Sequence, residues 1–228
     1  MGVPGAAFFD LDRTLLARSS SLALAGIFRR RGLIRRRQLV KAGLAQLVFM
    51  RFGVDESTVR RMAERGMAVL NGVRVDELRE IVAEALEPVL KPLVYTEALD
   101  LAGSHAAAGE RTYIVSGALE EVVQALALEL GFDDALGSRC GRVEGVFTGR
   151  VERALYGRAK ADALDELAAR DELDLSVSTA YSDSHTDLAF LERVGNPVAV
   201  NPDRQLRTLA EARGWPVLRF TKRGVRTP

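Results

Sequence analysis

The stretch FFDLDRTLL, residues 8–16, decides the fold, because an apolar run ends there in two acidic residues and then resumes. With the two alanines before it, residues 6–9 read as a short buried strand that delivers side chains at its carboxyl end. Asp10 and Asp12 can take different roles in one reaction if a cation reduces their repulsion: one can attack phosphorus while the other donates or accepts a proton. A solvated turn also attracts aspartate, but it does not explain apolar residues on both sides. The pair is therefore interpreted as chemical.

The bulk composition predicts an ordinary globular protein of one domain, or of one domain that carries an insertion. The chain has 228 residues, 47% hydrophobic and 28% charged, and a formal net charge of +1, which argues against nucleic acid as a partner. Cys140 is the only cysteine and is expected to be a buried apolar residue, so no intrachain disulfide is possible. Without a secretory signal or an apolar stretch long enough to span a bilayer, we expect a soluble, cytoplasmic protein.

Residues 19–92 carry helical periodicity and no strand pattern, which predicts an all-helical insert. Helix starts are expected at Asp55 and Asp76, and the last helix should stop at Pro88. The apolar positions that recur at helical spacing form three sets: Leu39, Val40, Leu44, Leu47 and Val48; Val59, Met62, Ala63, Met67 and Leu70; and Leu78, Ile81, Val82, Ala85 and Leu86.

After Pro92 helices and strands alternate, which is typical of a parallel sheet covered by helices on both faces. The predicted elements are a helix at 96–108, a strand at 112–115, a helix at 118–130, a hairpin within 135–151, a helix at 157–170, a strand at 176–181, a helix at 185–192, a strand at 197–200, a helix from Asn201-Pro202-Asp203 to Gly214, and a strand at 216–220. The tail TKRGVRTP is expected to be mobile. The fold class is therefore α/β, a doubly wound, Rossmann-like sheet with an inserted helical cap. The expected domains are a core of 1–18 and 93–228 and a cap of 19–92.

Three further motifs stand near strand or helix ends. Ser116-Gly117 follows the strand at 112–115 and is predicted to open a helix, where a hydroxyl and backbone N–H groups would cradle phosphate. Lys160, in the first turns of a helix, could neutralise phosphoryl charge, although a solvated lysine is an equal alternative. Asp183 and Asp187 follow another apolar strand and suit Mg²⁺, which is held by few carboxylates and by waters. Asp183 would be the ligand, and Asp187 would support the site without binding the metal.

The two histidines are expected to be structural. His185 lies between two acidic residues, but Mg²⁺ prefers oxygen ligands, so it is interpreted as a surface or wall residue. His105 falls within a predicted helix and is interpreted as a hydrogen-bonded structural side chain.

In their order and position the four motifs resemble those of the haloacid-dehalogenase-like hydrolase superfamily, and most nearly its phosphoserine-phosphatase-type subclass with a helical cap. DLDRT resembles the first motif, VSG the second, Lys160 the third and YSDSHTD the fourth. The resemblance covers about residues 6–18 and 93–220, while the cap is similar in kind and place only. It implies a phosphomonoester hydrolase that acts on a small molecule through an aspartyl-phosphate intermediate.

The resemblance also implies roles for individual residues. Asp10 would be the nucleophile and Asp12 the general acid and base. Mg²⁺ would be held by Asp10, by the backbone carbonyl of Asp12 and by Asp183. Thr14 would hold the motif loop. The phosphate-binding residues would be Thr14, Ser116, Gly117 and Lys160, of which Lys160 would also stabilise Asp10.

The sequence departs from the subclass at positions that concern the substrate. Phosphoserine phosphatases carry a glutamate after the first motif that recognises the substrate amine, and Ser19 stands there instead. Arg60, Arg61 and Arg65 are candidates for the carboxylate-binding arginine. The SHTD sequence replaces a glycine-rich, asparagine-containing fourth motif. The reaction class survives these departures, but the identity of the substrate stays open.

The predicted cap is rich in arginine, with RRRGLIRRR at 29–37, then Lys41 and the apolar segment GLAQLVFM at 43–50. A solvated face over an ordinary helix core explains this pattern. It also allows attraction to an anionic substrate, or peripheral contact with a membrane that carries a lipid phosphate. Met50, Met62 and Met67 fall in the same region, as gap fillers or as an adaptable pocket wall. A lipid-phosphate phosphatase is therefore the alternative within the same reaction class.

Other classes of protein use similar residues. A receiver domain also surrounds a phosphorylated aspartate with acids, a hydroxyl and a lysine, but it is shorter, lacks the insert and carries that aspartate on a middle strand. A non-catalytic phosphate-binding protein would ordinarily lose one of the acids, and none is missing here. A phosphotransferase would use the same nucleophile with a different acceptor, so the sequence leaves it open.

Overall fold

The computed structural model describes residues 3–34, 61 and 64–224 of the chain. Within them one sheet of seven strands runs in the order β4-β3-β2-β1-β5-β6-β7, with every pair parallel except β3 and β4. The strands are β1 (Ala6–Phe9), β2 (Arg111–Leu119), β3 (Asp134–Val143), β4 (Val146–Arg153), β5 (Thr179–Ser182), β6 (Asn196–Val200) and β7 (Val217–Leu218). The predicted α/β sheet is confirmed.

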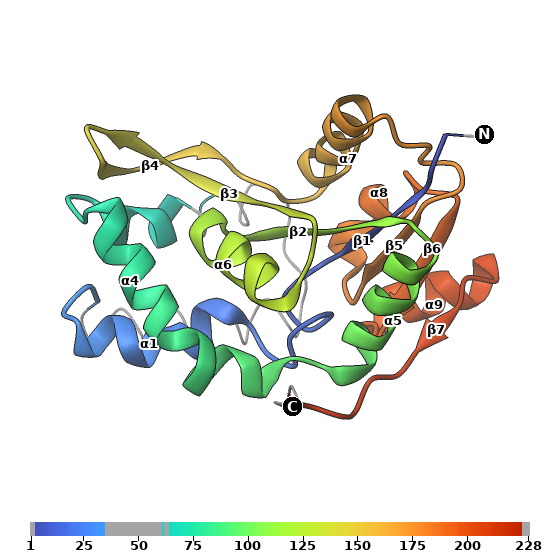
Figure 1. Ribbon diagram of the computed structural model, residues 1–228, viewed down its shortest axis with the longest axis horizontal. Helices are drawn as coiled ribbons and strands as arrows, with labels where there is room; N and C mark the ends of the chain where they lie inside the picture. The colour runs from blue at the N-terminus through green and yellow to red at the C-terminus, as the bar shows by residue number, and fades with distance from the viewer. Residues whose placement is uncertain (1–2, 35–60, 62–63, 225–228) are drawn as a thin grey trace.

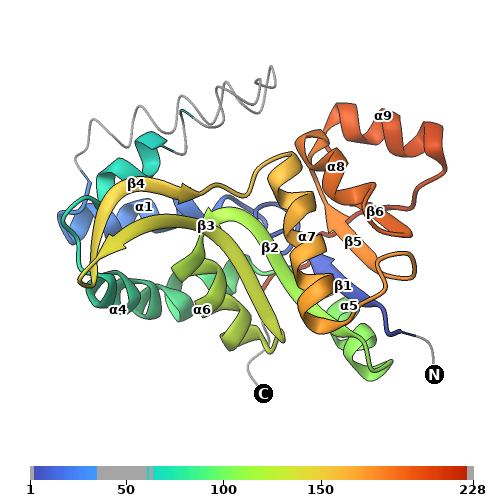
Figure 2. The ribbon, with the colours of Figure 1, turned by 90° about the horizontal axis from the view of Figure 1, so that it is seen from above.

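Strand β1 is buried on both faces, which explains its unbroken apolar sequence. Phe8 packs with helices α7 (Arg158–Asp171), α8 (Leu188–Leu191) and α9 (Arg204–Arg213). Phe9 packs with α5 (Thr96–Ala107) and α6 (Glu120–Leu130) on the other face. Figure 2 shows the two layers of helices on opposite sides of the sheet. The neighbours of β1 belong to the two halves of the sheet, so a site at its carboxyl end lies at the point where the strand order reverses.

The described part of residues 19–92 is mostly helical, as predicted. It contains α1 (Ser20–Arg30), the short helix η1 (Ala68–Leu70), α4 (Val75–Ala85), and the turns η2 (Leu86–Leu90) and η3 (Lys91–Leu93). Helix α4 ends at Ala85, before the predicted stop at Pro88, but the chain continues through Pro88 in the π-helical turn η2. The predicted apolar set from Leu39 to Val48, with Val59, Met62 and Ala63, lies outside the described residues.

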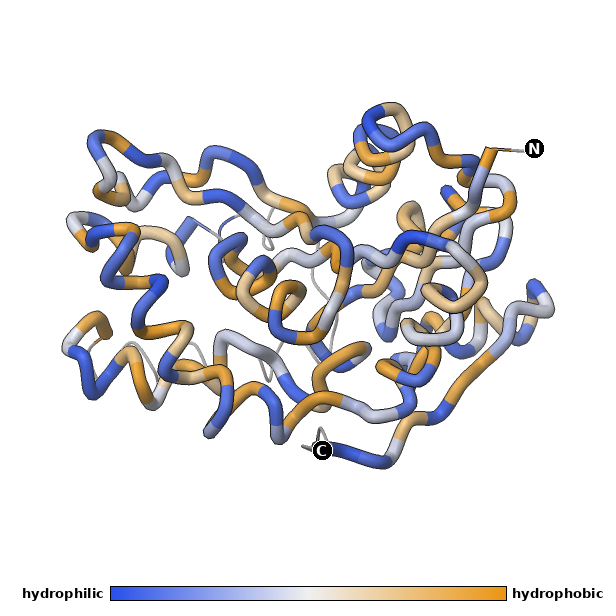
Figure 3. Tube along the Cα trace, viewed as in Figure 1, coloured by the Kyte–Doolittle hydropathy of each residue, from blue (hydrophilic) through white to orange (hydrophobic). Residues whose placement is uncertain are grey.

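Helix α4 joins this region to the sheet. Its apolar side chains alternate with charged ones, as the hydropathy colours of Figure 3 show along its length, and Leu78 and Ile81 are buried in the same cluster as Phe9. Figure 1 shows α4 beside α6 and the β3–β4 hairpin. At the hairpin tip, the N–H of Gly72 donates to Phe147 and the N–H of Val75 donates to Gly145, each at 2.9 Å. The division into a core and a cap stays a prediction.

The chain end was expected to be mobile, and residues 221–224 contradict this. The backbone N–H groups of Thr221 and Lys222 each donate to a Glu97 carboxylate oxygen at 2.9 Å, and that of Gly224 donates to the carbonyl of Val94 at 3.0 Å. A charged acceptor for two successive backbone donors explains the anchoring. Among the described helices none has the length and apolar character that crossing a membrane requires.

Candidate active site

Asp10 lies directly after β1, and its position is fixed by the sheet. Its backbone N–H donates to the carbonyl of Tyr181 on β5 at 2.9 Å, and its side chain is 9% exposed. Lys160 Nζ donates to Asp10 Oδ1 at 2.6 Å. Within the described residues no hydrogen bond engages Asp10 Oδ2. Burial raises the pKa of Asp10 and the nearby Asp187 raises it further, against the opposing charge of Lys160.

The turn after Asp10 is tight and presents Asp12 to helix α1. Arg13 adopts a left-handed conformation with φ 69°, and the N–H groups of Leu15 and Leu16 both donate to the carbonyl of Leu11. The backbone N–H of Ser20 donates to Asp12 Oδ1 at 2.8 Å. Asp12 thus satisfies a free donor in the first turn of α1, a place usually served by the N-cap side chain. Burial raises the pKa of Asp12 and these hydrogen bonds oppose the shift, so Asp12 is held at a helix end while remaining a possible proton carrier.

Lys160 connects Asp10 to Asp187. It is the third residue of α7, as predicted, and its ammonium group also donates to Asp187 Oδ2 at 2.6 Å. The same oxygen accepts from the Ser182 hydroxyl at 2.6 Å. Burial alone would lower the pKa of Lys160, but the two carboxylates outweigh it and raise the pKa, so the lysine stays protonated. The solvated alternative is wrong, because Lys160 is fully buried and its ammonium lies 4.6 Å from the ring centre of Phe190.

Asp183 follows β5 and faces the same edge of the sheet. Its Oδ2 lies 3.2 Å from Arg13 Nε but makes no hydrogen bond, although it is buried. Burial and the neighbouring Asp10 raise the pKa of Asp183 well above its ordinary value. A buried carboxylate oxygen without a hydrogen bond is costly unless a cation or water satisfies it. Asp183 therefore has the character expected of a metal ligand.

The residues fit a divalent cation held by oxygen. Asp10, Asp183 and Asp187 are buried and Asp12 is partly buried, while the cationic side chains beside them are Lys160 and Arg13, so negative charge is in excess. In the described ranges no three acidic, histidine or cysteine side chains form a ready cluster. Asp10 and Asp183 would hold Mg²⁺ there together with waters and, as the resemblance implies, the backbone carbonyl of Asp12, because Mg²⁺ prefers few protein ligands.

The second motif is placed differently from the prediction. Strand β2 continues to Leu119, so Ser116 and Gly117 lie within it and do not open α6, which begins at Glu120. The pairing of β2 with β3 shifts its register between the pairs Val115–Leu136 and Leu119–Ser138, and Ser116 and Gly117 lie in that interval. The Ser116 hydroxyl accepts from the N–H of Ala118 at 3.1 Å, which leaves it able to donate to a phosphate oxygen. Thr14 is buried, and its hydroxyl has no hydrogen-bond partner among the described residues.

Tyr156 is a site residue that the sequence analysis missed. A Cβ placed on Gly117 would lie 2.3 Å from Tyr156 Cε1, so the tyrosine ring packs directly on the second motif. Burial raises the pKa of Tyr156 to about 12, with further contributions from the charges of Asp12 and Asp10. A tyrosine in a loop has no periodicity or spacing that marks it. Its place four residues before Lys160 is the only signal that the sequence offers.

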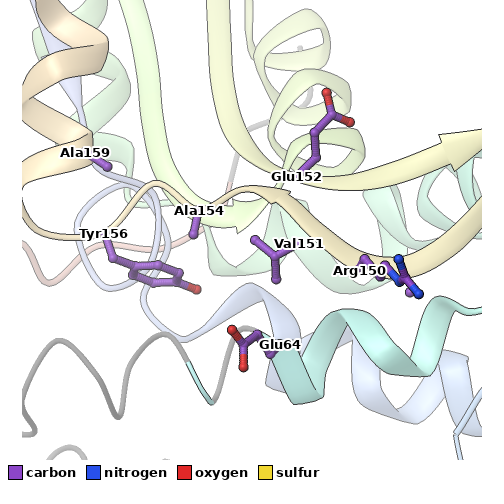
Figure 4. A pocket seen from close by; sticks show the side chains of 8 residues that line it. Glu64, Arg150, Val151, Glu152, Ala154, Tyr156 and Ala159 are labelled. Carbon is purple, nitrogen blue, oxygen red and sulfur yellow. The ribbon is translucent and has the colours of Figure 1, made fainter.

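The cap candidates are only partly described. Ser19 is buried, and its hydroxyl lies 2.9 Å from that of Ser21 at the start of α1. Met67 is buried in the core, as a gap filler would be. Arg61 and Arg65 are exposed, and Figure 4 shows Glu64, between them in sequence, beside Tyr156 and Val151. The remaining candidates and the basic segment beyond Ile34 lie outside the described residues: Arg60, Lys41, Met50 and Met62.

The two histidines and the cysteine are placed as predicted. His105 is hydrogen bonded on both ring nitrogens, to Glu110 at 2.5 Å and to the Tyr181 hydroxyl at 2.8 Å. His185 pairs through Nδ1 with Asp203 at 2.9 Å. Cys140 is buried in the core.

Comparisons with known proteins identify the family to which the chain is similar. Residues 7–192 match the model of the haloacid dehalogenase-like hydrolase family. The chain is 46% identical to the "inhibition of morphological differentiation protein" of Streptomyces azureus, over 94% of this chain and 78% of that one. It is 35% identical to the phosphoserine phosphatase SerB1 of Mycobacterium tuberculosis, over 94% and 70% of the two chains. A crystal structure of a Bordetella pertussis protein of unknown function is similar with a TM-score of 0.84 and 27% identity, covering 95% of this chain and 99% of that one.

Proposed function

Because the chain belongs to the haloacid dehalogenase-like hydrolase family, we propose that it is a Mg²⁺-dependent phosphatase that hydrolyses a small phosphomonoester through an aspartyl phosphate on Asp10. The observation that carries the proposal is the position of Asp10. Lys160 holds one carboxylate oxygen at 2.6 Å, and no hydrogen bond within the described residues engages the other. The phosphatase names among its relatives, SerB1 included, support the same reaction class.

The residues divide the reaction into two displacements. Asp10 Oδ2 attacks phosphorus and the bond to the ester oxygen breaks, while Asp12 gives its proton to the leaving alkoxide. Water then attacks the aspartyl phosphate, passes a proton to Asp12 and releases inorganic phosphate, which regenerates Asp10. A bound Mg²⁺ would supply positive charge at the phosphoryl oxygens. Lys160 supplies charge from the protein, and proton transfer by Asp12 accounts for roughly 10²–10⁴-fold of the rate.

The test of the reaction class is phosphate release from a chromogenic ester. We expect release by the wild type with Mg²⁺ and little after chelation. Asp10→Asn should lower kcat by at least about a thousandfold, because the amide is a poor nucleophile. Asp100→Asn, an exposed change on α5, is the matched control and should keep full activity. If the wild type releases no phosphate, or if Asp10→Asn matches it, the proposal is wrong.

The substrate is expected to differ from phosphoserine. Ser19 stands in the sequence where phosphoserine phosphatases carry the glutamate that pairs with the substrate amine, and a hydroxyl offers that amine no charge. Phosphoserine turnover should therefore be weak or moderate within a panel of small phosphate esters and lysophospholipid phosphates. A hundredfold preference for phosphoserine over every other member would contradict this. The lipid-phosphate alternative depends on the basic segment at 29–41, most of which the structure does not describe, and it stays a prediction.

A further inference from the structure

A cavity of about 590 Å³ lies between strand β4 and the cap residue Glu64. Its described walls combine small and apolar residues with charged ones, and they include Gly149, Val151, Ala154, Ala159, Tyr156 and Glu64. Figure 4 shows the Tyr156 hydroxyl pointing into the space between Val151 and Glu64. This volume is in the range of sites that bind small molecules, and it is large for the organic part of a three-carbon ester.

Tyr156 joins this cavity to the candidate phosphate site. The Cδ1–Cε1–Cζ edge of its ring lies against Gly117, and the ring also lines the cavity. Ala159, another wall residue, precedes Lys160, whose ammonium group contacts Asp10. An ester with its phosphoryl group at Asp10 would therefore extend its alcohol portion along Tyr156.

We propose that this cavity receives the alcohol portion of the substrate and that Tyr156 selects phosphomonoesters whose alcohol carries a planar ring. The proposal rests on the phosphatase activity proposed above. Charged residues of both signs, Arg150 and Glu152 among them, line the cavity, so net charge selects weakly between substrates. Tyr156 supplies the aromatic surface among the described wall residues. Tyr156 is partly buried, and ring-on-ring contacts with it favour a planar group over an aliphatic one of similar polarity.

The experiment compares two esters with similar alkyl leaving groups, 2-phenylethyl phosphate and propyl phosphate, by kcat/KM with saturating Mg²⁺. The wild type should prefer the phenylethyl ester by at least about tenfold, in line with one aromatic contact and its buried area. Tyr156→Leu should reduce that preference, the ratio of the two kcat/KM values, to less than about threefold. Tyr156→Phe keeps the ring and should keep the preference.

A second variant tests the cavity without removing the tyrosine. Val151→Phe fills the space beside Tyr156 and should lower the ratio of kcat/KM for the phenylethyl ester to kcat/KM for propyl phosphate by at least about tenfold. Val143→Phe is the matched control. Val143 lies on the paired strand, is 63% exposed and lines a separate cavity of about 400 Å³ near the hairpin tip. This control should behave as the wild type.

The outcomes separate the two proposals. If the wild type hydrolyses neither ester, the proposed phosphatase function fails. If it hydrolyses both without preference for the ring, the function stands and the cavity proposal is overturned. The cavity proposal is also overturned if Tyr156→Leu lowers kcat/KM for both esters by the same factor. It is overturned as well if Val151→Phe and Val143→Phe both keep the wild-type ratio of kcat/KM between the two esters.

Discussion

Lys160 shows how one side chain can be fixed by charge when burial opposes it. Its ammonium group is removed from water, yet two carboxylates at 2.6 Å and the face of Phe190 surround it. Removing one partner of such a buried set leaves an uncompensated charge, which costs more than a surface ion pair contributes. The sequence could place Lys160 at a helix start but could not show that Asp187 shares it with Asp10.

Lys160→Met is expected to lower kcat by at least about a hundredfold and the free energy of unfolding by about 3 kcal/mol at neutral pH. The reason is that Asp10 and Asp187 would then face each other without a cation. Urea unfolding and phosphate release measure the two effects. The matched control is Lys91→Met, which also removes a lysine paired with two carboxylates, but those of Glu87 and Glu129 are 70% and 36% exposed and stay solvated, so stability should change little. Equal stability of the two variants would contradict this reading of Lys160.

Gly117→Ala tests the contact between the second motif and Tyr156. The added methyl group would lie 2.3 Å from the ring, so the loop or the tyrosine must move, and we expect kcat/KM for propyl phosphate to fall at least about tenfold. The double variant Gly117→Ala with Tyr156→Leu removes the clash and should recover most of that loss. If the double variant is no better than the single one, the defect lies in the backbone of β2 and not in the contact with Tyr156.

At the scale of elements, the sequence predicted β1 and α7 well because each joins an apolar pattern to a polar residue, whereas β5 begins at Thr179, three residues later than predicted. It failed at Ser116-Gly117, because a glycine after a strand suggests a turn, while the pairing of β2 with β3 carries the strand on to Leu119. That pairing depends on residues about 20 positions away, which local pattern does not reveal. Tyr156 was missed for the same reason, since only the fold brings it against Gly117.

Helix α9 was also predicted in the right place but with the wrong first residue. Asp203 is its N-cap, and its Oδ1 accepts from the N–H of Leu206 at 2.8 Å. Its Oδ2 accepts from the N–H of His185 at 2.9 Å, which ties the turn after Asp183 to α9. Asn201, expected at the start of this helix, instead exchanges hydrogen bonds with the backbone of Phe220. The short polar residues were recognised, but their partners were not.

Asp203→Ala is expected to lower the free energy of unfolding by about 1 kcal/mol at pH 7, the usual cost of losing such a cap. Burial would raise the pKa of Asp203, but hydrogen bonds from Leu206 and His185 outweigh it and lower the pKa. A carboxylate with a lowered folded-state pKa stabilises the protein above its unfolded value of about 3.9, and the contribution is lost as the pH falls through the folded-state value. Urea unfolding should thus show the difference between variant and wild type shrinking below about pH 4. Asp100→Ala is the control, and a difference that grows on acidification would contradict the assignment.

At the scale of the whole molecule, the sheet explains why residues from four distant segments meet. Parallel strands β1 and β5 place Asp10 and Asp183 side by side at their carboxyl ends, at the reversal of strand order. The described helices of residues 19–92 pack into the same hydrophobic core as one face of the sheet. Leu24 of α1 and Leu78 of α4 share one apolar cluster with Phe9.

This shared cluster predicts a single cooperative unfolding transition. Trp215, the only tryptophan, packs in the cluster on the opposite face of the sheet, so its fluorescence reports on the far side from α1 and α4. Its urea transition should coincide with that of far-ultraviolet circular dichroism, which follows all the helices. Two separated midpoints would show that the residues of the expected cap unfold on their own.

The most direct test of the central claim is the identity of the phosphorylated residue. Wild-type protein is mixed with Mg²⁺ and an ester that it hydrolyses, quenched in acid within one turnover, and digested. One phosphate should then be found on the peptide that contains Asp10. Asp10→Asn should carry none, and Asp12→Asn should carry more than the wild type, because the loss of the base slows the attack of water more than the first displacement. Phosphate on any other residue, or rapid product release with Asp10 unmodified throughout, would contradict the account.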